Sequence, residues 1–143
     1  IDVDSCLHWL RVPRGDVLQV LLNLLNNAID CSGEGGTITL TVRVEPDAIR
    51  MAVSDQGPGI PPENLPQIFD PFFTTKTGGD LKGMGLGLSI SQSLVLAMGG
   101  TIEVQTQPNS GSTFSVILPR RVAQAGAQDQ SDTINKEVMH HDE

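Results

Sequence analysis

Residues 82–89 read Lys-Gly-Met-Gly-Leu-Gly-Leu-Ser, and they place three alternating glycines at the start of a helix that is predicted over residues 84–98. The residues that follow are apolar at helical spacing and end in a glycine pair: Ile90, Leu94, Val95, Met98 and Gly99-Gly100. Glycines allow a close approach of the backbone, and the free N–H groups of a helix N-terminus attract phosphate. A flexible loop that only caps a helix would show the same pattern, so the neighbouring motifs decide between the two.

A second helix is predicted from residue 17 to about residue 31, with Asp16 as its N-cap. Its apolar residues cover more than one face, which implies burial against a sheet. Gln19, Asn23 and Asn27 recur every four residues and therefore stack. An exposed polar stripe would explain them. Their mostly apolar neighbours favour partial burial instead, and two amide oxygens one turn apart can share an octahedral Mg²⁺ whose other ligands are water and phosphate.

Asp55 follows a predicted strand and opens the sequence Asp-Gln-Gly-Pro-Gly-Ile, residues 55–60. Such a segment is typical of a tight turn in which the aspartate side chain bonds its own backbone. It is equally typical of a site where Gly57 and Gly59 remove side-chain bulk and the carboxylate accepts a hydrogen bond from an exocyclic amine such as adenine N6. The chain has neither a Walker sequence nor the dinucleotide-binding glycine spacing, so a nucleotide site here would be of another type.

The rest of the chain is predicted to form two hairpins around a long irregular segment. Strands are expected at residues 37–44, 48–54, 101–105 and 112–118, with one or two short strands within residues 1–12. Residues 55–83 are rich in Gly, Pro and Thr, with a short helix near residues 62–68, and a segment of this length is more often a functional lid than a spacer. We therefore expect one domain over residues 1–120 and a linker or disordered tail over residues 121–143.

Composition restricts the class of partner. The formal net charge is -8 and the isoelectric point is near 4.6, which argues against nucleic acid or an anionic membrane as the main partner. No apolar run approaches the roughly 18 to 20 residues that a membrane span needs. Cys6 and Cys31 lack the spacing of a metal site and are expected to be reduced thiols in a cytosolic domain. The chain does not begin with Met, and we expect it to be a piece of a larger protein.

Four motifs in this order closely resemble the ATP-binding catalytic domain of bacterial sensor histidine kinases, which share a superfamily with gyrase, Hsp90 and MutL. The motifs are Asn-Leu-Leu-Asn-Asn-Ala at 23–28, Asp-x-Gly-x-Gly-Ile at 55–60, Ile-Phe-Asp-Pro-Phe-Phe-Thr-Thr-Lys at 68–76, and Gly-x-Gly-Leu-Gly-Leu at 83–88. The resemblance spans about residues 10–119. It implies an α/β fold, a two-layer α/β sandwich whose mixed, mainly antiparallel sheet is covered by helices on one face, with a mobile ATP lid.

The resemblance also implies roles for individual residues. Asn23 and Asn27 would be the catalytic pair and would hold Mg²⁺ against the ATP phosphates. Asp55 would accept a hydrogen bond from adenine, assisted through water by Ser112. The remaining nucleotide-binding positions would be Gly57, Gly59, Ile60, Lys76, Lys82, Gly83, Gly85, Leu86, Gly87 and Leu88. Phe69, Phe72 and Phe73 would hinge and anchor the lid.

The implied function is phosphoryl transfer in two-component signalling. The domain would bind ATP and release ADP, and would pass the γ-phosphoryl group to a histidine of a dimerisation domain in the same protein. A response regulator would be an indirect partner. The domain would be cytoplasmic and free of membrane contact, although the parent protein could be membrane-anchored.

Asn23 separates this function from ATP hydrolysis. Gyrase and Hsp90 carry a glutamate general base at the matching position, and an amide cannot accept a proton from water at neutral pH. An anti-sigma-type serine kinase and a non-catalytic nucleotide-binding module remain as alternatives. Asp30 departs from the family, because some members have a basic residue near that place, so neutralisation of phosphate would rest on Lys76, Lys82 or a partner.

Overall fold

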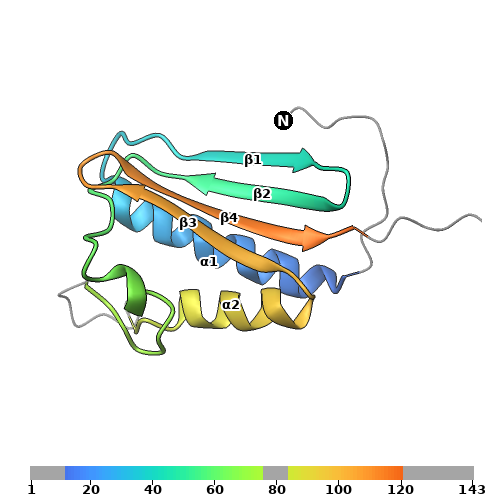
Figure 1. The fold of residues 1–143 in the computed structure, drawn as a ribbon. Helices are drawn as coiled ribbons and strands as arrows, with labels where there is room; N and C mark the ends of the chain where they lie inside the picture. Colours follow the sequence, from blue (N-terminus) through green and yellow to red (C-terminus); the bar gives the residue numbers. More distant parts are fainter. Residues whose placement is uncertain (1–11, 76–83, 121–143) are drawn as a thin grey trace, which may run out of the picture.

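In a computed structural model of the chain, which describes residues 12–75 and 84–120, two α-helices cover one face of a four-stranded sheet (Figure 1). The strands are β1 (Thr39–Val44), β2 (Ala48–Ser54), β3 (Thr101–Gln107) and β4 (Gly111–Pro119), in the order β1-β2-β4-β3. The predicted two-layer sandwich with helices on one face is confirmed. Within the described ranges, every strand pairing is antiparallel.

β4 lies inside the sheet because it pairs with both β2 and β3. Its register aligns Ser54 with Thr113 on one side and Gln105 with the same Thr113 on the other. This register places Asp55, the first residue after β2, beside Ser112. The Asp55 N–H donates to the Ser112 carbonyl over 2.9 Å, so the pairing continues past the end of β2.

Helix α1 (Arg14–Ser32) supplies the largest share of the helical layer. It begins three residues earlier than predicted, after Pro13, and no side chain among the described residues caps it. Asp16 therefore lies in the first turn and is not the N-cap, so that expectation was wrong. Pro13 occupies the N-cap position itself, with a φ of -62° and an extended ψ of 119°, and it has no side-chain oxygen with which to cap the helix.

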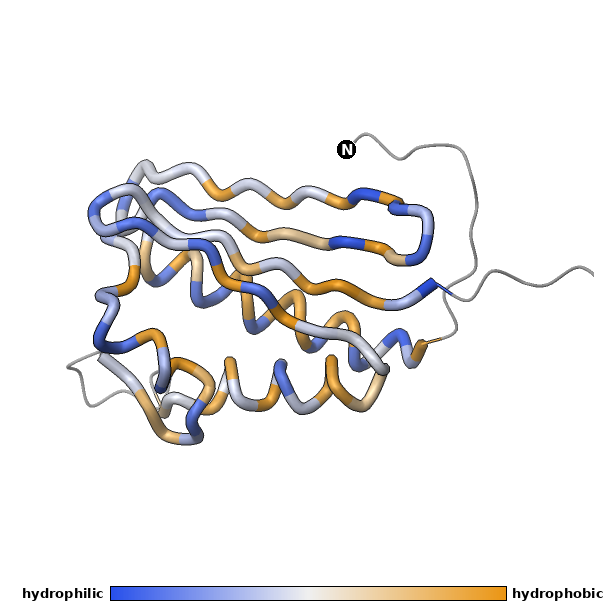
Figure 2. Tube along the Cα trace, in the orientation of Figure 1, coloured by the Kyte–Doolittle hydropathy of each residue, from blue (hydrophilic) through white to orange (hydrophobic). Residues whose placement is uncertain are grey.

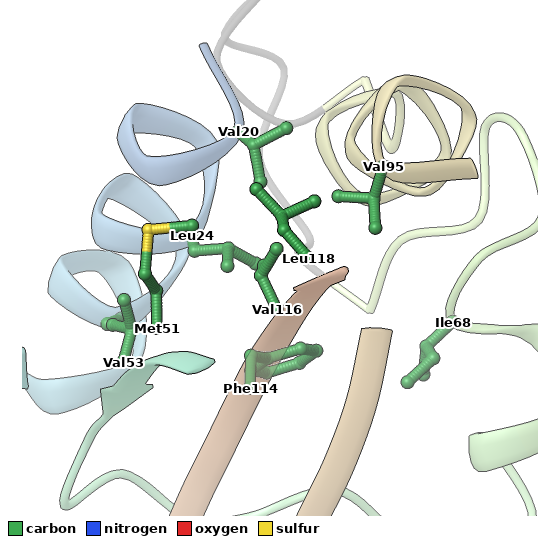
Figure 3. Packing of buried hydrophobic residues seen from close by; sticks show 10 residues of the cluster. Val20, Leu24, Met51, Val53, Ile68, Val95, Phe114, Val116 and Leu118 are labelled. Carbon is green, nitrogen blue, oxygen red and sulfur yellow. The ribbon is translucent and has the colours of Figure 1, made fainter. Parts of the chain in front are cut away.

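The core is a layer of apolar side chains between α1, α2 (Gly87–Ala97) and the sheet (Figure 3). α1 contributes Val20, Leu24 and Ala28 at helical spacing, and β2 and β4 contribute alternate residues. The members that the structure buries are Val20, Leu24, Ala28, Met51, Val53, Ile68, Val95, Phe114, Val116 and Leu118. α1 and α2 also pack against each other, which brings residues 23 and 87 together.

β1 is less covered than the other strands. Its apolar side chains Leu40, Val42 and Val44 lie opposite the core residues Val53 and Met51 and the partly buried Ile49, yet each remains 40% to 46% exposed. Figure 2 shows this strand at the edge of the sheet, with the helices below the other strands. The strand was predicted to be half-buried. Its edge position leaves it outside the reach of α1, which packs against β2.

Some predictions concern residues outside the described ranges. These are any strand within residues 1–11, the part of the lid at residues 76–83, and the tail at residues 121–143. Within the described residues, no helix is long and apolar enough to cross a membrane.

Candidate nucleotide site

A cavity of about 320 Å³ opens between α1, the start of α2 and the segment after β2. This volume falls in the range of small-ligand sites. Seven of the predicted positions line it: Asn23, Asn27, Gly59, Ile60, Gly85, Gly87 and Leu88. Residues from three distant parts of the sequence therefore meet around one space.

The cavity has an apolar floor that sequence motifs alone do not reveal. Ile68 and Phe114 belong to the buried core and also line the cavity, and the partly buried Phe73 joins them. A flat aromatic base can pack on such a surface. Sequence reasoning did not assign the lining residues Asn26, Cys31, Pro58, Pro61, Asn64, Thr74 and Thr75 to the site. Only the fold brings them there.

Asp55 is held rigidly beside the cavity. The residue is 9% exposed, and its Oδ1 atom accepts hydrogen bonds from the N–H groups of Gly57 (2.9 Å) and Ser112 (3.2 Å). The Asx turn and the binding interpretation of this motif are therefore compatible. Both bonds use the same oxygen, so Oδ2 is the atom that this carboxylate can offer to a ligand.

Gly57 is required by the space around it. A Cβ atom at this position would lie 2.7 Å from the Cys31 carbonyl oxygen and 3.0 Å from Asp55 Oδ1. Any side chain would push the loop away from α1 and from the carboxylate. The glycine therefore keeps the Asp55 turn packed against the end of α1, where Asp30 and Cys31 line the cavity.

Ser112 is buried and connects the Asp55 turn to β3. Its hydroxyl lies 3.0 Å from Thr106 Oγ1, which also accepts a hydrogen bond from the Ile60 N–H at 2.9 Å. Asp55, Gly57, Leu86 and Ser112 are not among the residues that line the cavity. Gly57 and Ser112 hold the Asp55 carboxylate beside the cavity, and Thr106 connects Ser112 to Ile60, which does line it.

Asn23 connects the two helices at the other end of the cavity. Its Nδ2 donates to the Gly87 carbonyl oxygen (3.1 Å) and to Ser91 Oγ (3.2 Å), and its Oδ1 accepts from Gln19 Nε2 (2.9 Å). Ser91 is fully buried. The side chain thus fixes the first turn of α2 against α1. An amide oxygen has two lone pairs, so Oδ1 still has one position for another donor or for a cation.

The N-terminus of α2 faces the cavity. The helix begins at Gly87, after the N-cap Leu86, and within the described part of the chain no side chain caps it. Its free N–H groups and the positive end of the helix dipole suit an anion. The helix starts three residues later than predicted, so Gly85 belongs to the preceding turn, and Gly83 lies outside the described residues together with Lys76 and Lys82.

The three predicted lid phenylalanines behave differently. Phe69 and Phe73 are partly buried against the core, as an anchor requires. Phe72 is 71% exposed and has a positive φ of 68°, so its side chain anchors nothing within the described chain. Its backbone N–H donates instead to the Gly85 carbonyl over 3.0 Å, which ties the lid base to the turn before α2.

These features fit an adenine nucleotide and Mg²⁺. One end of the cavity has an apolar floor with a fixed carboxylate nearby, and the other has an open helix N-terminus beside amide groups. Amide oxygens are hard donors of the kind that Mg²⁺ accepts, and Asn23 and Asn27 are both in place to provide them.

Comparisons with known proteins agree with this geometry. The family model described as histidine kinase-, DNA gyrase B-, and HSP90-like ATPase matches residues 14–122. Sensor histidine kinase ZraS of Escherichia coli K12 is 41% identical over 125 residues, which are 87% of this chain and 26% of ZraS. Sensor kinase CckA of Brucella abortus is 39% identical over an alignment of 144 positions, which covers 90% of this chain and 15% of CckA. The chain thus spans about a quarter or less of these relatives.

Solved structures show the same fold. The nucleotide-free catalytic domain of histidine kinase ThkA has a TM-score of 0.67 at 39% identity, and the match covers 76% of this chain and 70% of that catalytic-domain chain. A mycobacterial sensor histidine kinase, MprB, has a TM-score of 0.68 at 31% identity over 78% of this chain and 77% of MprB. Full-length ShkA, solved with AMPPNP, has a TM-score of 0.63 at 34% identity over 74% of this chain and 22% of ShkA.

Proposed function

The chain belongs to the family of histidine kinase-, DNA gyrase B- and HSP90-like ATPases, and from this premise we propose that it is the ATP-binding catalytic domain of a sensor histidine kinase. It binds Mg²⁺-ATP and transfers the γ-phosphoryl group to a histidine of a dimerisation domain. The observation that carries the proposal is the meeting of Asn23, Asn27, the Asp55 turn and the α2 N-terminus around one cavity.

The adenine end of the site is assigned to the Asp55 turn. The Oδ2 atom of Asp55 accepts a hydrogen bond from the adenine amino group, while Oδ1 stays bonded to Gly57 and Ser112. The base packs on the apolar floor made by Ile68 and Phe114. A carboxylate acceptor favours adenine over guanine, since guanine carries a carbonyl oxygen where adenine has its amino group.

The phosphate end is assigned to the start of α2. The backbone N–H groups near Gly87 and Leu88 bind phosphate oxygens, and Asn23 and Asn27 provide amide oxygens for Mg²⁺. The metal supplies neutralisation of the charge that the phosphates develop during transfer. Lys76, Lys82 and Gly83 lie outside the described residues, and their contribution to phosphate binding stays a prediction.

Transfer is favoured over hydrolysis by the chemistry of Asn23. Its Nδ2 is committed to Gly87 and Ser91, so the side chain presents an amide where a general base would need a carboxylate. Water in the site is therefore poorly activated, and the nucleotide survives until an acceptor histidine arrives. The relatives include the sensor histidine kinases ZraS and RcsC, and these names favour histidine as the acceptor over the serine of an anti-sigma-type kinase.

The test is phosphoryl transfer in trans. The full chain is incubated with Mg²⁺ and ATP labelled at the γ-phosphate, together with a histidine-containing dimerisation domain from a sensor kinase. We expect acid-labile label on that domain with little release of inorganic phosphate, and loss of label with Asn27→Ala. Acid-stable label would indicate a serine kinase, and rapid phosphate release without transfer would indicate an ATPase; either result would contradict the proposal.

A further inference from the structure

The loop of residues 55–60, which follows β2, packs closely against the turn between β3 and β4. The Asn109 N–H donates to the Pro58 carbonyl oxygen over 2.7 Å. A Cβ atom at Gly59 would collide with the Gln107 carbonyl oxygen, so the two backbones are in direct contact. The conformation of the loop therefore depends on a turn that lies far from it in the sequence.

Thr106, near the end of β3, holds the far end of this loop with its side chain. Its Oγ1 atom accepts a hydrogen bond from the Ile60 N–H (2.9 Å), donates one to the Gly111 carbonyl oxygen (3.2 Å) and lies 3.0 Å from Ser112 Oγ. A hydroxyl group has one proton and two lone pairs. Because the proton is donated to Gly111, the lone pairs accept from the Ile60 N–H and the Ser112 hydroxyl. The hydrogen-bonding capacity of Thr106 is thus fully used.

The other hydrogen bonds between the loop and the β3–β4 hairpin use no hairpin side chain. The Asp55 N–H donates to the Ser112 carbonyl oxygen, the Ser112 N–H donates to Asp55 Oδ1, and Asn109 uses its backbone N–H. Among the described residues, the bond from Ile60 to Thr106 is therefore the one that a side-chain substitution in the hairpin removes. Ile60 lines the cavity and Thr106 is not among the described lining residues, so the threonine acts on the site through the loop.

We propose that Thr106 is a positioning residue that holds residues 55–60 in the conformation that receives the base of the nucleotide. This inference rests on the proposed function, since the loop belongs to the adenine end of the site. Without the hydroxyl, the Ile60 N–H loses its partner and the loop populates other conformations, which nucleotide binding has to reverse. One hydrogen bond of typical net strength corresponds to about fivefold in an equilibrium constant, and we expect a loss of this size in affinity.

The test is a calorimetric titration of the full chain with Mg²⁺-ATP, in which the hydroxyl at residue 106 is removed or retained. Thr106→Val keeps the branched shape that suits a strand but lacks the hydroxyl, and it should bind about fivefold more weakly than wild type. Thr106→Ala also lacks the hydroxyl, needs less space and should show the same loss. Thr106→Ser retains the hydroxyl and should keep the wild-type affinity.

Thr113→Val is the matched control. Thr113 Oγ1 also pairs with a serine hydroxyl in a neighbouring strand, Ser54 Oγ at 2.8 Å, but strand alternation places its side chain on the sheet face opposite to that of Ser112. This variant should bind Mg²⁺-ATP with the wild-type affinity. Circular dichroism should show the wild-type spectrum for all the variants.

Wild-type affinity in folded Thr106→Val or Thr106→Ala would overturn the inference and leave the proposed function intact. A loss in Thr106→Ser or Thr113→Val as large as that in Thr106→Val would also overturn it, because such a loss would reflect a general effect on the strands. If the wild-type chain does not bind Mg²⁺-ATP, the inference and the proposed function both fail.

Discussion

Asn23→Ala tests two roles of Asn23, which are to hold α2 against α1 and to bind the nucleotide complex. The substitution removes the bonds from Nδ2 to the Gly87 carbonyl and Ser91 Oγ, and the bond that Oδ1 accepts from Gln19. The part-buried bond to Ser91 is worth about 1 kcal/mol, the more exposed bond to Gly87 about 0.5 kcal/mol, and the bond along the helix surface about 0.3 kcal/mol. Alanine returns about 0.6 kcal/mol through its higher helix propensity.

The expected net loss in the free energy of unfolding is about 1.2 kcal/mol. In a domain of this size it corresponds to a fall of about 5 °C in the melting temperature. The assay is urea denaturation followed by circular dichroism at helix wavelengths. Asn26→Ala is the matched control: Asn26 is exposed on the same helix, so its replacement should leave stability unchanged or raise it by about 0.6 kcal/mol.

Equal stability of the Asn23→Ala and Asn26→Ala variants would show that Asn23 does not hold α2 to α1. Asn23→Ala also tests the site. It should weaken binding of Mg²⁺-ATP by at least tenfold, since the start of α2 and one amide donor are both affected. The stability difference is expected with or without nucleotide.

Three other substitutions test the core, the adenine contact and the Asp55 turn. Leu24→Ala should lower the free energy of unfolding by about 2 to 5 kcal/mol in urea denaturation, because Leu24 is 1% exposed in the core. Asp55→Asn should weaken ATP binding by more than about tenfold in calorimetry, because a charge-assisted hydrogen bond to the ligand is lost. The melting temperature should change little, because the amide oxygen can still accept both backbone hydrogen bonds. Gly111→Ala would bring a Cβ onto the Asp55 carbonyl at a φ of 89° and should destabilise the fold by about 2 kcal/mol or more; Gly33→Ala, at a φ of 66° in open space, should cost only about 1 kcal/mol in the same assay.

Much of the helical layer could be predicted from periodicity. The four-residue spacing of Asn23 and Asn27 placed both side chains on one face, and the structure finds both lining the cavity. The start of α1 was missed because its first turn is polar and gives no apolar signal, and because its N-cap is a proline, which is not one of the usual capping residues. Local pattern thus identifies a helix better than it identifies its ends.

The start of α2 depended on a contact that the sequence does not show. Gly85 has a φ of 68° and accepts a hydrogen bond from Phe72, which holds it in a turn and delays the helix to Gly87. The same contact explains the exposed side chain of Phe72. An apolar residue within a motif was expected to be an anchor, but here the backbone forms the attachment and the side chain points away from the core.

The support behind the site also comes from tertiary structure. The motif around Asp55 predicted a turn or a ligand contact as alternatives, and the strand register makes both possible by bringing the Ser112 N–H to the carboxylate. The pairing of β2 with β4 thereby joins Asp55 and Ser112, which are 57 residues apart in the chain. Neither composition nor periodicity carries information on such a pairing, which is why Ser112 could be assigned only through the family resemblance.

The most direct test of the central claim is a calorimetric titration of the folded wild-type chain with Mg²⁺-ATP, with Asn27→Ala measured beside it. We expect saturable binding at a single site in the wild-type chain. Asn27→Ala should bind with a much lower affinity and have an unchanged circular dichroism spectrum. Absence of binding to the folded wild-type chain at millimolar nucleotide would contradict the central claim, as would equal affinity in the two chains.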